Sequence, residues 1–319
     1  GISPAGILDT ALLSSSKLRV LDWDLSDFNV DMILQGIVSA DFINTVSPTY
    51  SREIMTKERG EGLSEVLLAR EARVFGILNG IDSEEFDPVR DKYLAARLPP
   101  KIHDSKVSGK TYLDEVIKAK SANKVALQKK LGLTVDPLKP LVSMITRLVE
   151  RKGIGLLVRF LEEVGPNNTQ FVILGKGDPR FEEKLLQIAT KYPGQVSVQV
   201  RFDEPLARLI YSASDIFLVP SLFEPCGLTQ MVAMRYGAVP VVSRVGGLSD
   251  TVDDGLTGFT FSPVEFDPFK QALNLALDAF IKGKLTPIMG RGLTKDYSRD
   301  KSAQKYIKLY EKALNYKFG

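Results

Sequence analysis

The chain has 319 residues, 44% of them hydrophobic and 25% charged, as is typical of a globular protein of one or two domains. Its 42 basic and 39 acidic residues leave a net charge of +3, so we expect neither nucleic acid nor a membrane as partner. One cysteine and one histidine exclude a disulfide framework and leave almost no material for a metal cluster or a Ser-His-Asp triad. No apolar run is long enough to span a membrane and no signal-peptide pattern opens the chain, so we expect a cytoplasmic protein.

The first part of the chain predicts a small and incomplete α/β arrangement. Ser47 followed by Pro48 is a strong helix start, with serine as N-cap and proline at the first helical position. The expected elements are a strand at 18–21, a helix at 29–40, a strand at 41–46, a helix at 48–55, a helix at 63–73 and a strand at 74–78. Two or three strands are few for an independent core, so residues 1–81 are predicted to be part of a domain.

The segment 83–139 is polar and rich in proline, with one helix predicted over 121–131 and closed by Gly132. From residue 141 onward, strands and helices alternate. Strands are expected at 141–146, 170–174, 196–200, 216–219 and 239–242, and helices at 154–164, 180–191, 204–212, 228–236, 267–281 and 300–314. This alternation predicts right-handed crossovers and a doubly wound parallel sheet, complete within residues 82–295.

Loops that follow the strands carry residues suited to a phosphorylated ligand, and ligands of open α/β sheets bind at that edge. Arg147 and Lys152 flank the first loop and could converge on one anion; the alternative is a solvated basic loop. Gly175 opens a Gly-Lys-Gly-Asp turn with two of the three glycines of a dinucleotide fingerprint, a weak nicotinamide signal but a suitable turn beside a nucleotide. Phe202 follows a third strand and could stack on a base or pack on the following helix.

The loop after the strand at 216–219 combines an acid with a helix start that is suited to phosphate. Gly227 allows a tight turn into the helix, whose first N–H groups, around Leu228 and Thr229, could bind an anion. Glu224 places a negative charge beside that site, which requires a separate reason. Cys226 is interpreted as a small loop residue rather than a catalytic thiolate, and His103 as a solvated side chain.

Several stretches together resemble one known family. FEPCGLTQ (223–230), MRYGAVPVV (234–242) and GGLSDTV (246–252) are similar to motifs of bacterial glycogen synthases and plant starch synthases. TRLVERKG, LGKGDP, NTVSPTYSREI and GILNGID match further motifs in the same order, and the resemblance covers about residues 29–314. It implies the GT-B architecture, two Rossmann-like domains facing a cleft. Members transfer glucose from ADP-glucose, or UDP-glucose in some, to an α-1,4-glucan, with retention and without a metal or other cofactor.

The resemblance also implies roles for individual residues. Arg147 and Lys152 would hold the diphosphate and stabilise the leaving group, and Glu224 would contact the donor glucose. Nucleotide-sugar contacts would further come from Asn79, Gly175, Phe202, Cys226, Gly227, Leu228 and Thr229, with Phe202 where the family has a tyrosine against the adenine. The implied domains are an acceptor-side domain (1–81), a nucleotide-sugar domain (82–295) and a helix crossing back (296–319).

The family's N-terminal Lys-x-Gly-Gly-Leu loop and the histidine of that domain do not occur in the sequence, so we expect a member lacking most of its N-terminal domain. The leading hypothesis is a retaining glucosyltransferase that extends glycogen or starch from ADP-glucose, in the cytoplasm or, in a plant or alga, the plastid stroma. A second is a non-catalytic nucleotide- or glucan-binding or regulatory module derived from a synthase. A third, another sugar-nucleotide transferase of the same architecture, is weakened by FEPCGLTQ.

Overall fold

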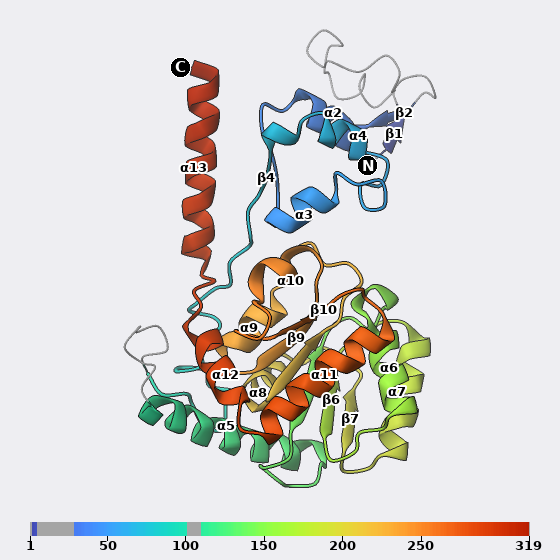
Figure 1. The fold of residues 1–319 in the computed structure, drawn as a ribbon, viewed down its shortest axis with the longest axis vertical. Coiled ribbons are helices and arrows are strands. Elements are labelled where there is room, and N and C mark those ends of the chain that lie inside the picture. Colours follow the sequence, from blue (N-terminus) through green and yellow to red (C-terminus); the bar gives the residue numbers. More distant parts are fainter. Residues whose placement is uncertain (1, 5–28, 101–109, 319) are drawn as a thin grey trace. The chain divides into compact units, whose positions relative to one another are not determined.

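The computed structural model describes residues 2–4, 29–100 and 110–318 (Figure 1). The chain forms two compact units, Gly1–Ile77 with Lys305–Gly319 (unit 1) and Leu78–Gln304 (unit 2). The strand expected at 18–21 and the side chain of His103 lie outside the described residues. Among the residues that are described, none of the helices combines the length and the apolar character needed to cross a membrane.

The strands of unit 1 are short and form two separate pairs. Strand β1 (Ile2–Pro4) pairs antiparallel with β2 (Asn29–Asp31), and β3 (Ile43–Thr45) pairs in parallel with β4 (Val74–Gly76). Both β3 and β4 were predicted, with slightly longer bounds. Strands of three residues leave little room for a core between them, so the unit depends on side-chain contacts with its helices.

The predicted capping of α3 (Pro48–Glu53) is confirmed, because Ser47 Oγ accepts a hydrogen bond from Tyr50 N at 2.8 Å. The helix expected at 29–40 is wrong at its start. It is α2 (Met32–Ser39), and Asp31 caps it by accepting hydrogen bonds from the first turn, while the residues before it form β2.

The helix expected at 63–73 is not continuous. It divides into α4 (Ser64–Leu68) and a 3-10 turn, η2 (Glu71–Arg73). Between them, Arg70 donates from its guanidinium to the carbonyl oxygen of Val38 at 2.8 Å, a tertiary contact that sequence periodicity does not contain.

Unit 2 is built on a six-stranded parallel sheet of order β10-β9-β8-β5-β6-β7. The strands are β5 (Leu141–Ile145), β6 (Gln170–Leu174), β7 (Val196–Gln199), β8 (Ile216–Val219), β9 (Val239–Ser243) and β10 (Phe259–Phe261). The helices that follow them are α6 (Ile154–Glu163), α7 (Pro179–Lys191), α8 (Glu204–Ala213), α9 (Thr229–Arg235), α10 (Gly246–Thr251), α11 (Phe266–Ile281) and α12 (Leu285–Thr294). The predicted doubly wound domain is therefore confirmed, and the strand order reverses between β5 and β8.

Helices cover both faces of this sheet (Figure 1). Successive residues of β5 and β6 point to opposite faces: Val142 and Phe171 join one apolar cluster with α6, α7 and α11, whereas Leu141 and Val172 join another with α5 and α8. Apolar side chains on both faces explain why these strands read as continuous hydrophobic runs.

Three elements of unit 2, α10, α12 and β10, were not expected from the sequence. The helix predicted at 121–131 is also too short. It is the last half of α5 (Lys110–Leu131), which Gly132 ends at φ +69°. The buried face of α5 carries polar residues, among them Lys120, Asn123 and Gln128, so no apolar stripe marks the helix in the sequence.

The last helix, α13 (Arg299–Phe318), begins one residue before the predicted start and continues four residues beyond the predicted end at 314. The larger part of α13, from Lys305 onward, belongs to unit 1. There the Tyr316 ring meets Phe42 edge-on at 5.4 Å, and its hydroxyl accepts a hydrogen bond from Arg73 at 2.7 Å. Exposed positions of α13 carry Lys and Tyr side chains, among them Tyr310 and Tyr316.

Candidate active site

A pocket of about 220 Å³ lies at the point in unit 2 where the strand order reverses. Its walls are the carboxyl ends of β5 and β8 and the loops that follow these two strands. Six of the residues singled out from the sequence line it: Arg147, Lys152, Glu224, Gly227, Leu228 and Thr229. Ligands of open α/β sheets bind at this edge, so the fold itself explains why these residues converge.

The loop after β5 is held directly against the loop after β8. Gly153 adopts φ +72°, and a Cβ atom on it would stand 1.9 Å from the carbonyl oxygen of Pro220. Leu222 N donates to the carbonyl oxygen of Arg151 at 2.9 Å. Only glycine allows both the left-handed backbone and this close approach, and the approach brings Lys152 to the neighbouring loop.

The Glu224 carboxylate is held by two groups. Lys152 forms an ion pair with it, and Ser221 Oγ donates to its Oε2 at 3.0 Å. Both partners of the ion pair are largely withdrawn from water, with side chains 19% (Lys152) and 11% (Glu224) exposed. A pair with this burial is screened by solvent and salt less than a surface pair.

The backbone of the Glu224 loop is fixed from the other side by α10. A Cβ atom on Gly246 would stand 2.0 Å from the Glu224 carbonyl oxygen, and one on Gly247 would stand 2.3 Å from that of Cys226. Gly247 N also donates to the carbonyl oxygen of Glu224 at 3.2 Å. The glycines of the GGLSDTV motif therefore allow α10 to pack directly against the backbone of the FEPCGLTQ loop.

The turn into α9 is fixed by hydrogen bonds of its own. Gly227 adopts φ +70°, and the Gln230 side-chain amide donates to the Gly227 carbonyl oxygen and to Thr251 Oγ1, both at 3.0 Å. Gln230 and Ser221 are fully buried and were not singled out from the sequence. Gln230 could have been recognised from the sequence because it belongs to the FEPCGLTQ motif, whereas no sequence pattern identifies Ser221.

Four predicted residues do not line this pocket: Asn79, Gly175, Phe202 and Cys226. Gly175 lies beneath it, because a Cβ atom there would stand 1.8 Å from the Thr146 carbonyl oxygen, beside Arg147. This fits the close-packed turn that the sequence predicted. Phe202 is 93% exposed, so the alternative that it packs on the following helix is wrong.

Cys226 is buried beneath the loop, with 5% of its surface exposed. Burial is the main cause that raises the pKa of its thiol, opposed by a hydrogen bond from the Asn79 backbone. The thiol is therefore held protonated, in agreement with its interpretation as a loop residue rather than a nucleophile. The same hydrogen bond places the Asn79 backbone beside the FEPCGLTQ loop.

Within the described ranges, no group of three or more histidine, cysteine, aspartate or glutamate side chains is arranged to hold a metal ion. The charged groups of the pocket are instead the two cations Arg147 and Lys152 and the anion Glu224. Two cations and one anion favour a ligand that carries negative charge together with neutral hydrogen-bonding groups.

Two family models match the chain. Residues 5–69 match the starch synthase catalytic domain, and residues 128–282 match glycosyl transferases group 1. A glycogen synthase of Thermosipho melanesiensis is 42% identical over 97% of this chain, and one of Syntrophotalea carbinolica is 40% identical over 96%. The chain spans 64% and 61% of the length of these two relatives.

Solved structures agree with the sequence relatives. The catalytic domain of starch synthase IV from Arabidopsis thaliana, bound to ADP and acarbose, matches 98% of this chain and 64% of its own, with a TM-score of 0.85 and 33% identity. Sucrose-phosphate synthase from Thermosynechococcus elongatus shares the fold, with a TM-score of 0.59 and 20% identity. The third sequence hypothesis is thereby set aside, and the chain belongs to the glycogen synthase and starch synthase family of GT-B glycosyltransferases.

Proposed function

We propose that this chain carries the donor site of a retaining glucosyltransferase that extends an α-1,4-glucan, glycogen or starch, from ADP-glucose without a metal ion. The observation that carries the proposal is the convergence of Arg147, Lys152 and Glu224 on one pocket where the strand order reverses. ADP as the nucleotide is supported by the related starch synthase IV, whose structure contains ADP and acarbose.

The charges of the pocket suit the two ends of a nucleotide sugar. Arg147 and Lys152 would bind the diphosphate through charge-assisted hydrogen bonds. Glu224, which is fixed by Ser221, would accept hydrogen bonds from glucose hydroxyls. The exposed Phe202 ring, which follows β7 at the same edge of the sheet, is free to stack on the adenine.

In the transfer step, the bond between glucose C1 and the diphosphate oxygen breaks, and its electron pair leaves with ADP. The acceptor hydroxyl forms the new bond on the same face of the sugar, and its proton passes to the departing phosphate. The reacting glucosyl group carries positive charge in the transition state while the diphosphate gains negative charge. Arg147 and Lys152 interact with that developing charge, so they stabilise the transition state more than the bound substrate.

The test is transfer of labelled glucose from ADP-glucose to glycogen by the purified chain, with UDP-glucose as the parallel donor. The proposal expects incorporation that depends on ADP-glucose and that falls by two orders of magnitude or more in Lys152→Met. ADP binding without any incorporation would contradict the proposal of a transferase and would favour the second hypothesis, a non-catalytic nucleotide-binding module. Incorporation from UDP-glucose alone would contradict the proposed donor.

A further inference from the structure

A second cavity, of about 350 Å³, lies in unit 2 at the edge of the sheet opposite the candidate active site. Its lining includes Asp215, immediately before β8, and Gly237, two residues before β9. Because the strands are parallel, residues that precede them mark the amino-terminal edge, whereas the candidate active site occupies the carboxyl-terminal one. The volume falls in the range of small-molecule sites, roughly 300–1,000 Å³.

The walls of this cavity are mostly apolar. They come from α5, the segment before β5, the start of β9, the end of α11 and the start of α12. The apolar residues include Ile117, Leu138, Val239, Phe280, Leu285 and Met289. An aromatic ring, a thioether and branched aliphatic groups together suit a flat or branched hydrocarbon body. Such walls gain free energy when they cover a ligand instead of water.

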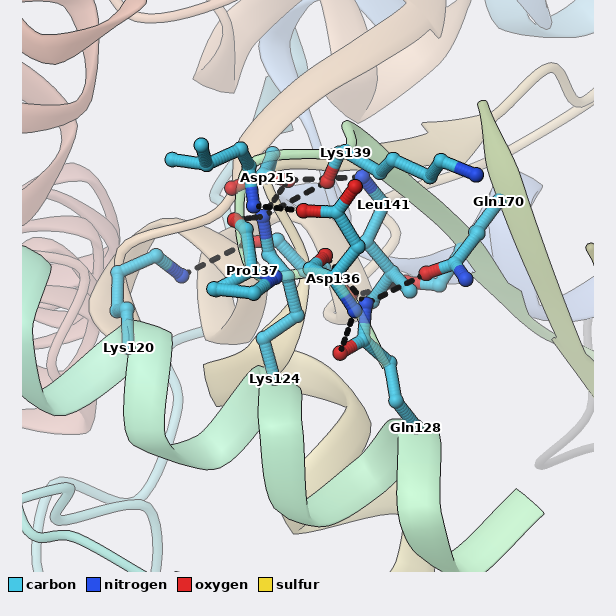
Figure 2. A network of polar contacts seen from close by, with 12 residues as sticks. Lys120, Lys124, Gln128, Asp136, Pro137, Lys139, Leu141, Gln170 and Asp215 are labelled. Atoms are coloured by element: carbon cyan, nitrogen blue, oxygen red, sulfur yellow. Dashed lines mark hydrogen bonds and ion pairs between the residues drawn. The ribbon is translucent and has the colours of Figure 1, made fainter. Parts of the chain in front are cut away.

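Two lysines of α5, Lys120 and Lys124, also line the cavity, and both are buried. Figure 2 shows their side chains and the polar contacts around Asp215. Lys124 Nζ pairs with Asp215 Oδ2 at 2.6 Å and donates to two backbone carbonyl oxygens at 3.0 Å. It also lies 5.1 Å from the centre of the Phe280 ring. The charge of Lys124 is therefore balanced by a carboxylate.

Among the residues that the structure describes, no carboxylate forms an ion pair with Lys120. This residue is 6% exposed, and within the described part of the chain its Nζ donates to three carbonyl oxygens, those of Ser212 at 2.8 Å, Ser214 at 2.7 Å and Tyr236 at 3.4 Å. When Lys120 is protonated, the two ammonium groups and one carboxylate of the cavity lining leave one surplus positive charge in a poorly solvated wall. A charge in such a position is costly unless an anion approaches it.

The first turn of α12 also favours an anion in this cavity. Its first two residues, Leu285 and Thr286, line the cavity, and no side chain caps the helix at Lys284. The unpaired N–H groups of a first helical turn favour negative charge.

We propose that this cavity is a second ligand site, which binds a small amphipathic anion with an aromatic or branched hydrocarbon body and one carboxylate, sulfonate or phosphate group. The body lies against Phe280, Leu285 and Met289, and the anionic group lies toward Lys120 and the start of α12. The ligand does not compete with ADP, because none of the residues that line the candidate active site lines this cavity.

The probe for the test is 8-anilinonaphthalene-1-sulfonate, an aromatic monoanion, titrated calorimetrically into the full chain with and without saturating ADP. Met289→Trp and Thr286→Trp each fill the cavity and should weaken binding tenfold or more. Leu186→Trp places the same side chain on the exposed surface of α7 and should leave the affinity unchanged. Circular dichroism confirms that each variant is folded. Because Thr286 is only partly buried, Thr286→Trp serves as the test if Met289→Trp does not fold.

The role of charge is tested with N-phenyl-1-naphthylamine, the uncharged analogue of the probe. Lys120→Met should weaken binding of the sulfonate at least tenfold and leave binding of the neutral analogue within twofold. In the wild-type chain, affinity for the sulfonate should fall as pH rises through about 7, the value to which burial lowers the pKa of Lys120. Asp215 and Lys124 are the charged groups that act on Lys120, in opposite directions.

Three results would overturn the proposal: equal affinity of the filled variants and the wild type, equal loss of both probes in Lys120→Met, or displacement of the probe by ADP. The comparison of the filled variants and the comparison of the two probes require neither glucose transfer nor ADP binding. A failure of this second site is therefore distinguishable from a failure of the proposed donor site.

Discussion

Lys152 donates to the carboxylate of Glu224, and this ion pair joins the loop after β5 to the loop after β8. The two residues were expected to serve different ends of a nucleotide sugar, the diphosphate and the glucose. Their contact means that each holds the other in the pocket before a ligand arrives. When a diphosphate enters, Lys152 can direct its other N–H groups to phosphate oxygens while Ser221 keeps its hydrogen bond to Glu224.

Arg147 gives the first prediction. Arg147→Ala should weaken ADP binding by about 1.5–3 kcal/mol, the usual value of a hydrogen bond to a charged group. Titration calorimetry measures it. Arg159→Ala is the matched control, because Arg159 is an exposed arginine of α6 that pairs with Glu163 and does not line the pocket. Equal ADP affinity in the Arg147 variant and the wild type would show that the basic loop is only solvated.

The second prediction concerns Gly153, whose close approach to Pro220 brings the two loops together. Gly153→Ala should lower the free energy of unfolding by about 2–5 kcal/mol, which combines left-handed strain with a steric clash. Gly132 shares the left-handed backbone, with φ +69°, but has open space around a Cβ atom. Gly132→Ala should therefore cost only about 1–2 kcal/mol. Urea denaturation measures both, and equal losses would refute the role of the Pro220 contact.

The third prediction is a pH dependence of stability that originates at Lys120. Burial lowers the pKa of this lysine to about 7 in the folded chain. The unfolded chain, with an ordinary lysine pKa of about 10.4, then binds more protons between these two values. The free energy of unfolding should rise with pH across that window, and the penalty should be fully present below pH 7. Denaturation of the wild type and Lys120→Met at several pH values measures the difference, and parallel curves would contradict it.

Strands β6 and β8 have the bounds that the sequence predicted, because a strand buried on both faces is a continuous apolar run between polar loops. The edge of the sheet where ligands bind followed from the alternation of strands and helices. Helix α5 could not be recognised in full, since its buried face holds lysines and glutamine whose partners lie far away in sequence. The Lys152–Glu224 ion pair could not be predicted from the sequence either, because it depends on how closely Gly153 approaches Pro220.

Comparison of ADP and ADP-glucose affinities in Glu224→Gln decides whether this pocket binds the diphosphate through Arg147 and Lys152 and the glucose through Glu224. The wild type should gain affinity from the glucose of ADP-glucose. The variant should lose that gain, about 1–3 kcal/mol, because a neutral amide cannot replace a carboxylate acceptor. Its affinity for ADP should stay equal or increase, since Lys152 is released from its ion pair. A loss of ADP affinity together with an unchanged gain from glucose would contradict the account.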